Sequence, residues 1–349
     1  MSQKVKINRY RRKITKSLTK GIGKTKTPKT GDLKNLKDVK RVLIVRANHR
    51  LGNLLLITPL LQEVLDTFPN AKVDLMIQGF LGPQLFESYD RVDHIIRLPR
   101  KPFKELGKYI KNACSVRKRK YDFTINATKG SSSGKIYTQL SRSKFKIYGS
   151  DDVDYSIEYS DAVHIAKEQI YAFRDFMNQL GFPRDQHPIK PLNINLTPAE
   201  LQTGKDRLLE IVDGTKPVIS IFTFATGSKC YKPDWWIPFY NRLLKEYPDY
   251  HILEILPYEN VSQIDFAAPS YYSKDIREIA AFTSHTQVWI GADCGIMHLA
   301  SASGAPVVGL FSRTNRQVYE PFNDGSFSLF TGDLSYDDII EAVDGVLKN

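Results

Sequence analysis

The sequence predicts an α/β protein of two domains, each built on a parallel β-sheet. The chain has 349 residues, about twice the length of a common domain. Short apolar runs of strand length alternate with segments of helical period, which is typical of parallel sheets with helical crossovers. The alternation stops at the proline-bearing segment 182–198 and then starts again. We therefore predict an α/β domain, a hinge and a second α/β domain.

The first domain is predicted to open with the apolar strand 41–45, RVLIV. Apolar residues then recur at helical spacing from Leu54 to Phe68, which predicts a helix with Pro59 near its start. Further strands are predicted at 72–77, 94–98, 122–126 and 145–148, with helical or loop segments between them, and a long helix is predicted from about 155 to 180.

The second domain repeats the alternation. Strands are predicted at 217–222, 250–256, 288–290 and 307–311. Helices are predicted near 200–212, 235–246, 276–282, 296–303 and 337–347.

The segment 288–311 contains the clearest site signal. Asp293 and Gly295 stand between an apolar strand and a helix rich in small residues. In open parallel sheets ligands bind at this strand end, and the free N–H groups of a helix N-terminus favour a phosphate. The alternative is an ordinary turn in which Asp293 only caps the helix.

The net charge of +12 is unevenly distributed. Residues 1–41 hold 15 Lys or Arg against two Asp, whereas the remaining residues hold 35 basic and 36 acidic side chains. We interpret the basic charge as a property of the N-terminal tail and not of the folded body.

Within the tail, residues 1–20 predict a basic amphipathic helix, and residues 21–40 are predicted to be a linker. Such a helix suits the surface of an anionic membrane. Nucleic-acid binding is the rival interpretation, less favoured because we expect no basic face on the body and find no reader motif there, and a disordered, solubilising extension is the other alternative.

The cysteines and the apolar runs bear on location. Cys114, Cys230 and Cys294 are odd in number and widely spaced, which favours a reducing cytoplasm over a disulfide framework. No apolar run approaches the roughly 20 residues of a spanning helix, and we expect no signal peptide. The predicted location is peripheral, on the inner face of the cytoplasmic membrane.

The C-terminal motif Asp293-Cys-Gly-Ile-Met-His298-Leu-Ala, followed by Gly304-Ala-Pro306 and VVGLF, resembles a known signature. The family 9 glycosyltransferases, typified by the ADP-heptose:lipopolysaccharide heptosyltransferases, carry Asp-(Ser/Thr)-Gly-x-x-His-Leu-Ala followed by Gly-x-Pro. The opening RVLIVRANHRLGNLLLITPLLQEV also resembles the strand, glycine loop and helix that begin these enzymes. The resemblance covers about residues 41–349.

This resemblance implies a GT-B fold, in which two Rossmann-like domains with parallel sheets face a central cleft. Residues 41–185 would form the acceptor-side domain and residues 186–349 the nucleotide-sugar-binding domain, with residues 1–40 outside them.

The implied activity is inverting transfer of a sugar, heptose in the first place, from a donor such as ADP-heptose to a lipopolysaccharide-core or related glycan hydroxyl. The partners would be a nucleotide sugar and an anionic glycolipid. No metal or other cofactor is expected, because helix N–H groups and a lysine can stabilise a leaving diphosphate.

The resemblance also implies donor-site residues. Lys229 has the family's spacing to Trp236, and Lys232 is a competing candidate. Cys294 stands where relatives carry a hydroxyl. Some of the residues in the predicted site also have a structural alternative. Residues 226–228 could form only a turn, Glu259 could be a solvated loop glutamate, and His298 could pack internally. The predicted donor site comprises Thr226, Gly227, Ser228, Lys229, Glu259, Asp293, Cys294, Gly295 and His298.

The main departure from the family is Asn53. Relatives carry Gly-Asp in this loop, and that aspartate is taken as the base for the acceptor hydroxyl. An amide has no basic lone pair useful at neutral pH, so Asn53 can orient an acceptor but cannot remove its proton. His49 could serve as the base instead, the proton could pass late to a phosphate oxygen, or the protein could bind without turnover.

The acceptor side is predicted from basic residues that follow strands of the first domain. Arg46, Arg50 and Lys129, the last in the loop 128–135, are the predicted acceptor-binding residues, with solvated surface side chains as the alternative. Two other functions remain open. One is a catalytically impaired nucleotide-sugar-binding family member. The other is a membrane or nucleic-acid tethering protein with an α/β scaffold.

Overall fold

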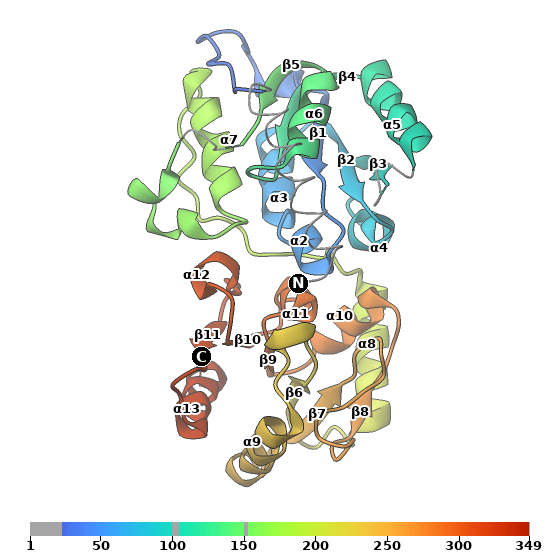
Figure 1. Cartoon of the computed structure of the whole chain (residues 1–349), viewed down its shortest axis with the longest axis vertical. Helices are drawn as coiled ribbons and strands as arrows, with labels where there is room; N and C mark the ends of the chain where they lie inside the picture. The colour runs from blue at the N-terminus through green and yellow to red at the C-terminus, as the bar shows by residue number, and fades with distance from the viewer. Residues whose placement is uncertain (1–22, 100–104, 150–152, 349) are drawn as a thin grey trace, which may run out of the picture. The chain divides into compact units, whose positions relative to one another are not determined.

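The structure is a computed structural model that describes residues 23–99, 105–149 and 153–348 (Figure 1). The chain divides into two compact units. Unit 1 comprises residues 1–49, 59–83 and 89–189, and unit 2 comprises residues 50–58, 84–88 and 190–349. The last change of unit, after Ile189, falls within the proline-bearing segment. The predicted tail helix in residues 1–20 lies outside the described residues.

Unit 1 is built on a parallel sheet with the strand order β3-β2-β1-β4-β5. In register, Val45 of β1 stands between Met76 of β2 and Asn126 of β4. The strands are β1 (Arg41–Arg46), β2 (Lys72–Gln78), β3 (Val92–Leu98), β4 (Lys120–Asn126) and β5 (Arg142–Ile147).

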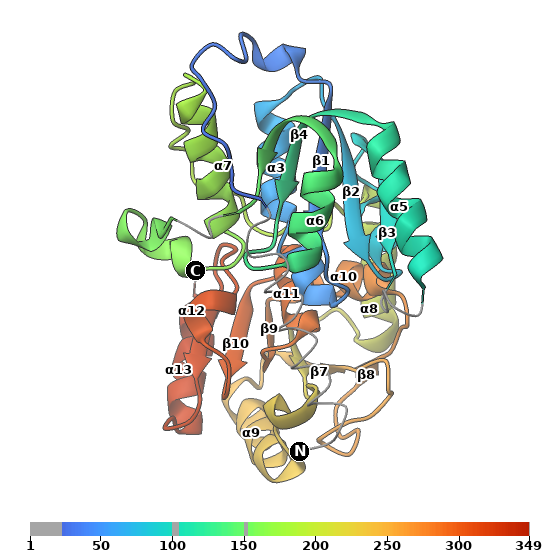
Figure 2. The same cartoon turned by 45° about the horizontal axis from the view of Figure 1, so that its top comes forward.

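Helices cover both faces of this sheet, which explains why its central strand β1 is buried and apolar from Val42 to Val45 (Figure 2). One face packs Leu43 and Val45 with Tyr137 of α6. The other carries an aromatic cluster in which Phe123 contacts Phe68 and Phe176. The helices and turns are η1 (Leu36–Asp38), α3 (Thr58–Thr67), α5 (Leu106–Lys118), α6 (Ser132–Leu140), η2 (Tyr155–Ile157), η3 (Ser160–Val163) and α7 (Glu168–Gln179).

Two predicted helices were wrong in part. The predicted helix from 155 to 180 is the two short turns η2 and η3 followed by α7, and the Asp154 side chain holds the first turn by accepting the Ser156 N–H. The predicted helix from Leu54 to Phe68 is broken into α2 (Leu51–Leu55) and α3. Pro59 has no N–H for the carbonyl of Leu55, and the Thr58 hydroxyl donates to that carbonyl at 2.8 Å instead.

The predicted linker and the predicted loop 128–135 also differ from expectation. Residues 23–32, here called the stem, run along unit 1: Thr25 Oγ1 accepts the N–H of Tyr148 at 3.0 Å, and the Gly31 N–H donates to the Leu180 carbonyl at 3.3 Å. In the loop, α6 already begins at Ser132, because the side chain of Ser131 caps it by accepting the N–H of Gly134.

Unit 2 contains a second parallel sheet, of order β11-β10-β9-β6-β7-β8. The strands are β6 (Val218–Phe222), β7 (His251–Ile255), β8 (Ser270–Tyr271), β9 (Val288–Ala292), β10 (Val307–Phe311) and β11 (Phe327–Phe330). The helices and turns of the region are α4 (Gly82–Phe86), α8 (Pro198–Ile211), η4 (Gly227–Lys229), α9 (Pro233–Glu246), α10 (Ile276–Thr283), α11 (Gly295–Ala302), α12 (Arg316–Tyr319) and α13 (Tyr336–Leu347).

The predicted α/β class with two parallel sheets is confirmed. Apart from the two split helices, the predicted elements match the structure within three residues at each end. The short elements β8, β11 and α12 were not predicted. Within the described ranges, no helix is long and apolar enough to span a bilayer.

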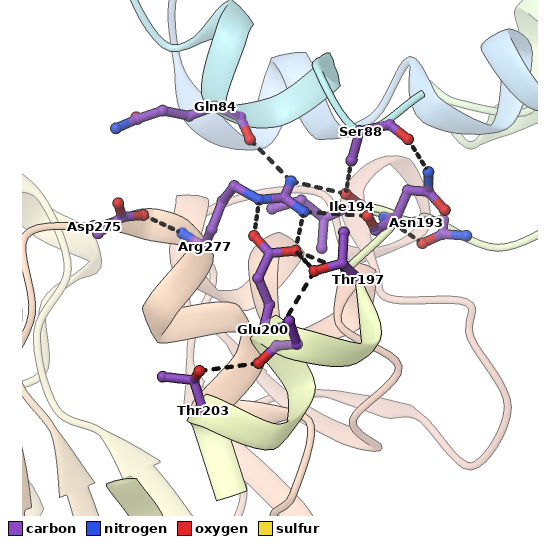
Figure 3. Close-up of polar contacts among 11 residues, drawn as sticks. Gln84, Ser88, Asn193, Ile194, Thr197, Glu200, Thr203, Asp275 and Arg277 are labelled. Atoms are coloured by element: carbon purple, nitrogen blue, oxygen red, sulfur yellow. Dashed lines mark hydrogen bonds and ion pairs between the residues drawn. The ribbon is translucent and has the colours of Figure 1, made fainter. Parts of the chain in front are cut away.

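Arg277 of α10 joins three separate segments of unit 2 (Figure 3). Its guanidinium makes two bonds to the Glu200 carboxylate, at 2.5 and 2.8 Å. The same group donates to the main-chain carbonyls of Gln84, Ile194 and Asn195 at 3.0–3.1 Å. The residue is 8% exposed, so these bonds are largely shielded from water. Arg277 therefore fixes the segment 193–195, by which the chain enters unit 2, to α8 and α10.

Candidate functional site at the carboxyl ends of β6 and β9

The strand order of unit 2 locates its expected ligand site. From β6 the chain continues to β7 and β8 on one side, and β9 is the neighbour of β6 on the other. Ligands of open α/β sheets bind outside the carboxyl ends of the strands at such a reversal. The residues that follow β6 and β9 are the η4 turn, with Lys229, and Asp293.

Lys229 and Asp293 meet at this point. Lys229 Nζ lies 2.5 Å from Asp293 Oδ2, and the Thr314 hydroxyl donates to the same oxygen. The Asp293 side chain is 7% exposed and the Lys229 side chain 35% exposed. Asp293 is not the helix cap that the alternative supposed, since Cys294 is the N-cap residue of α11. The carboxylate instead pairs with Lys229, whose side chain remains a third exposed.

The N-terminus of α11 lies beside this ion pair. A Cβ at Gly295 would stand 3.2 Å from Leu51 Cβ and 3.4 Å from Gly52 N, so glycine permits the close approach of α2. The Cys294 side chain makes no capping bond, and burial raises the pKa of its thiol to about 12. The thiol therefore stays protonated and is a weaker donor than the hydroxyl of relatives.

His298 is packed inside unit 2. Its side chain is 4% exposed, and a Cβ at Gly52 would approach His298 Cδ2 to 2.5 Å. Burial is the main cause that lowers the pKa of His298, Asp293 opposes the shift and Lys229 adds to it, and the net value is about 4. Its Nδ1 has no hydrogen-bond partner within the described structure. The ring is therefore a neutral imidazole facing α2.

The other predicted donor residues lie around this cluster. Thr226, Gly227 and Ser228 are exposed on the η4 turn, where Gly227 has a φ of 70°. Glu259 is exposed in the turn that follows β7. The competing Lys232 is the exposed N-cap residue of α9, whereas Lys229 contacts Asp293.

The predicted acceptor residues divide between the units. In unit 1, Arg46 is 2% exposed and its Nη1 donates to the Ala127 carbonyl at 2.5 Å, so its guanidinium connects the ends of β1 and β4. His49 Nδ1 lies 3.3 Å from Gln78 Oε1. The ammonium of Lys129 lies 2.5 Å from a carboxylate oxygen of Glu168. The exposed Arg50 and the half-buried Asn53 pack with unit 2 on and before α2.

Sequence reasoning missed a buried carboxyl at the same strand ends. Glu254 of β7 is fully buried, and its two oxygens accept from Thr223 Oγ1 at 2.5 Å and Ser262 Oγ at 2.7 Å. Burial raises the pKa of this carboxyl. It thereby connects the loops that follow β6 and β7. A charged residue in the strand HILEI was the available signal, because unpaired charges are rare in cores.

One group of metal-ligand type lies away from this site. Among the described residues, Asp74, Asp93 and His94 place three ligand atoms within 4.8 Å of one another. The guanidiniums of Arg41 and Arg119 bond to the oxygens of both aspartates, which suits an arginine–carboxylate network better than a cation. The expectation of a metal-independent reaction stays a prediction.

Comparisons with known proteins agree with this geometry. Residues 274–332 match the sequence profile of glycosyltransferase family 9 (heptosyltransferase). This segment contains α10, β9, α11, β10 and β11, and hence Asp293 and His298. A comparison with curated proteins found no match to the sequence.

Solved structures share the fold at low sequence identity. A glycosyl transferase family 9 protein from Veillonella parvula DSM 2008 superposes with a TM-score of 0.69 at 16% identity, over 88% of this chain and 97% of its own. The E. coli heptosyltransferase WaaC with ADP gives 0.65 at 14% identity, over 88% and 99%. The E. coli ADP-heptose lps heptosyltransferase II gives 0.62 at 14% identity, over 88% and 98%.

These structures confirm the predicted GT-B architecture, and the match over residues 274–332 confirms the predicted resemblance to family 9. The chain therefore has a GT-B fold like that of these structures, and its residues 274–332 are similar to glycosyltransferase family 9 (heptosyltransferase).

Proposed function

We propose that the protein transfers a sugar, heptose in the first place, from a nucleotide donor such as ADP-heptose to a hydroxyl of a lipopolysaccharide-core or related anionic glycolipid, with inversion. The Lys229–Asp293 ion pair at the start of α11 is the observation that carries this proposal. The solved WaaC structures hold ADP and ADP-2-deoxy-2-fluoro heptose, which supports an ADP-linked donor here.

The donor site would work by electrostatic stabilisation. When the sugar leaves, negative charge develops on the diphosphate, and a cation with helix N–H groups stabilises it without a metal ion. Lys229 is held close to the α11 N-terminus by Asp293 yet remains a third exposed, so its ammonium group can bond to a phosphate oxygen. The neutral His298 adds no positive charge at pH 7.

Proton removal from the acceptor is the step in which this chain departs from relatives. Asn53 can donate to or accept from the acceptor hydroxyl but cannot take its proton. We propose that turnover is retained, with the proton passing to another group such as His49 or to a phosphate oxygen of the donor. A protein that binds nucleotide sugar without turnover is the second candidate, and Asn53 is the observation that favours it.

The proposed location is the inner face of the cytoplasmic membrane, where an anionic glycolipid acceptor would be available. Residues 1–20, with their basic and apolar pattern, would add electrostatic attraction to that surface. A tethering protein with an inert body remains the third candidate, and nucleic acid is not an expected partner.

Replacement of Lys229 tests the donor site. The native protein should be stabilised against heat by one member of a panel of ADP-, GDP- and UDP-sugars. Lys229→Met should weaken that binding roughly 10- to 100-fold, the loss expected for a charge-assisted bond to phosphate of about 1.5–3 kcal/mol. Lys232→Met is the matched control and should bind as the native protein does. Equal losses in both variants would contradict the assigned site.

Asn53→Asp separates the enzyme from the binder. With the donor that stabilises the native protein, a transferase should release nucleoside diphosphate in the presence of acceptor, and the added carboxylate should increase turnover. A native protein that binds donor but shows no turnover until Asn53 is replaced would establish the binding-only function.

A further inference from the structure

The near-neutral balance of the body conceals two opposite charges. Residues 42–189 hold 22 basic and 16 acidic side chains, a balance of +6, whereas residues 190–349 hold 13 and 20, a balance of −7. Residues 97–146 alone hold 15 basic side chains against Glu105 and Asp122. The body as a whole is nearly neutral, as the sequence indicates, but the expectation that it has no basic face is wrong for unit 1.

Part of this charge lies on the outer side of α5. Ile110, Lys111, Cys114, Arg117 and Lys118 are all exposed, and their spacing of three to four residues places them on one side of the helix. Ile110 is 56% exposed, so an apolar side chain stands among the cations of α5. This mixture is the pattern of a helix that lies at a lipid interface.

The stem and β5 continue the charge. Lys24, Lys26 and Lys29 of the stem line a cavity of about 870 Å³ together with Lys144 and Lys146 of β5. Asp32 is the single acidic residue among the described residues of its lining. Its carboxylate accepts the main-chain N–H of Lys29. Five lysines therefore line the cavity with one carboxylate, and the ammonium groups of Lys144 and Lys146 donate to the main-chain carbonyls of Asp32 and Gln139.

Arg117 connects this cavity with α5. Burial lowers the pKa of Lys146, and the positive charges of Arg117 and Lys26 lower it further, so the three groups lie within electrostatic reach of one another. Like charges repel when they are held together, and a bound anionic surface would relieve that repulsion. We define the basic face as Lys24, Lys26, Lys29, Arg117, Lys144 and Lys146.

We infer that the basic face docks unit 1 on an anionic lipid bilayer, independently of residues 1–22. This inference rests on the proposed function, whose glycolipid acceptor lies in such a bilayer. Phe145 and Tyr148, the aromatic residues of β5 and its end that line the cavity, are at most 7% exposed and cannot stack on nucleic-acid bases. The negative balance of residues 190–349 gives unit 2 no comparable attraction to the same surface.

Vesicle binding by full-length protein tests the inference. The test variant carries Lys26→Gln, Arg117→Gln and Lys144→Gln, one change in each of the stem, α5 and β5. The control carries Lys205→Gln, Lys216→Gln and Lys245→Gln in unit 2. Both lose three positive charges. Partition is measured by sedimentation with phosphatidylglycerol–phosphatidylcholine vesicles and with phosphatidylcholine alone, and thermal melting checks that the variants fold.

The native protein should bind the anionic vesicles and not the neutral ones. Each cation near such a surface contributes a factor of roughly five, so the test variant should bind on the order of a hundredfold more weakly. The control should bind as the native protein does, and protein lacking residues 1–22 should keep measurable binding.

Four results would overturn the inference: unchanged binding by the test variant, an equal loss in the control, no binding once residues 1–22 are removed, or a single-stranded oligonucleotide that binds this face more tightly than the vesicles. None of these results affects donor turnover with a water-soluble acceptor, so failure of docking and failure of the proposed function are distinguishable.

Discussion

Removal of the Arg277 guanidinium should loosen the start of unit 2. Arg277→Met keeps most of the aliphatic part of the side chain. It deletes every bond that the guanidinium makes to the Glu200 carboxylate and to the carbonyls of Gln84, Ile194 and Asn195 (Figure 3). Four acceptor groups then lose the guanidinium at once. Thr197 still donates to the Glu200 carboxylate and Ser88 to the Ile194 carbonyl, but the half-buried carboxylate loses its counter-ion.

The loss of stability can be estimated from the lowered pKa of Glu200. The bond from Arg277, more than any other cause, lowers the pKa of Glu200 from 4.5 to about 2. At about 1.4 kcal/mol per unit this corresponds to roughly 3 kcal/mol, reduced to about 2 kcal/mol because the Glu200 side chain is 30% exposed. The three carbonyls that lose the guanidinium bond add to this, so we expect a total loss of about 3–5 kcal/mol.

The pH dependence has a definite sign. A carboxyl with a depressed pKa in the folded state stabilises the fold above its unfolded pKa and loses that contribution as pH falls. The difference between the native protein and Arg277→Met should therefore be complete at pH 6–7 and decrease between pH 4.5 and 2. Adding Glu200→Gln to the variant should recover part of the loss at neutral pH.

Amide hydrogen exchange in α8 and α10 is the suitable assay, because a chain of two units need not unfold in one step. Arg207→Met is the matched control, since Arg207 pairs with Glu210 on the exposed side of α8 and should not alter exchange. Unchanged exchange in Arg277→Met, or a loss that stays the same at pH 3, would refute the reasoning.

Three further substitutions test packing and charge elsewhere. Gly52→Ala would place a Cβ 2.5 Å from the His298 ring, so we expect α2 to be displaced. The melting temperature and the affinity for the donor should both fall. An unchanged melting curve would contradict this contact. The native protein should lose folding free energy as pH falls from about 6.5 through 4, because the buried His298 ring resists protonation, and His298→Asn should remove this pH dependence. Urea titrations at pH 7 and 5 would measure the difference. Equal pH dependence in both proteins would show that His298 is not its source. Asp74→Asn should cost about 2–4 kcal/mol, because the buried carboxylate neutralises Arg41 and Arg119, and urea denaturation that matches the native protein would contradict that role.

The elements that sequence predicted well are those whose signal is local. Strand 288–292 and helix 295–302 are adjacent in the chain, and the residues between them determine both ends, so the position of Asp293 could be inferred from about ten residues. The proximity of Lys229 required a family spacing, because no local pattern links residues 64 positions apart.

The misses have a different cause. Helical periodicity continued across Pro59 and across residues 155–167, but a missing N–H and side-chain bonds to the backbone interrupted the helices there. The Arg277 cluster joins residues 77 or more positions apart, and the basic face brings Lys26 near Lys146 from a distant part of the sequence. A charge count divided at residue 41 could not reveal the basic face, because it averaged the positive residues 42–189 with the negative residues 190–349.

The short helix α2 has a consequence for how such proteins can be recombined. Residues 50–58 lie between segments of unit 1 in the sequence but pack with unit 2, where Gly52 lies against the ring of His298. In a chimera that joins residues 190–349 to the N-terminal half of another protein, an unrelated segment would replace α2 beside the His298 imidazole. Residues 190–349 therefore cannot be exchanged alone, and a working chimera would have to carry its own copy of the segment 51–53, LGN.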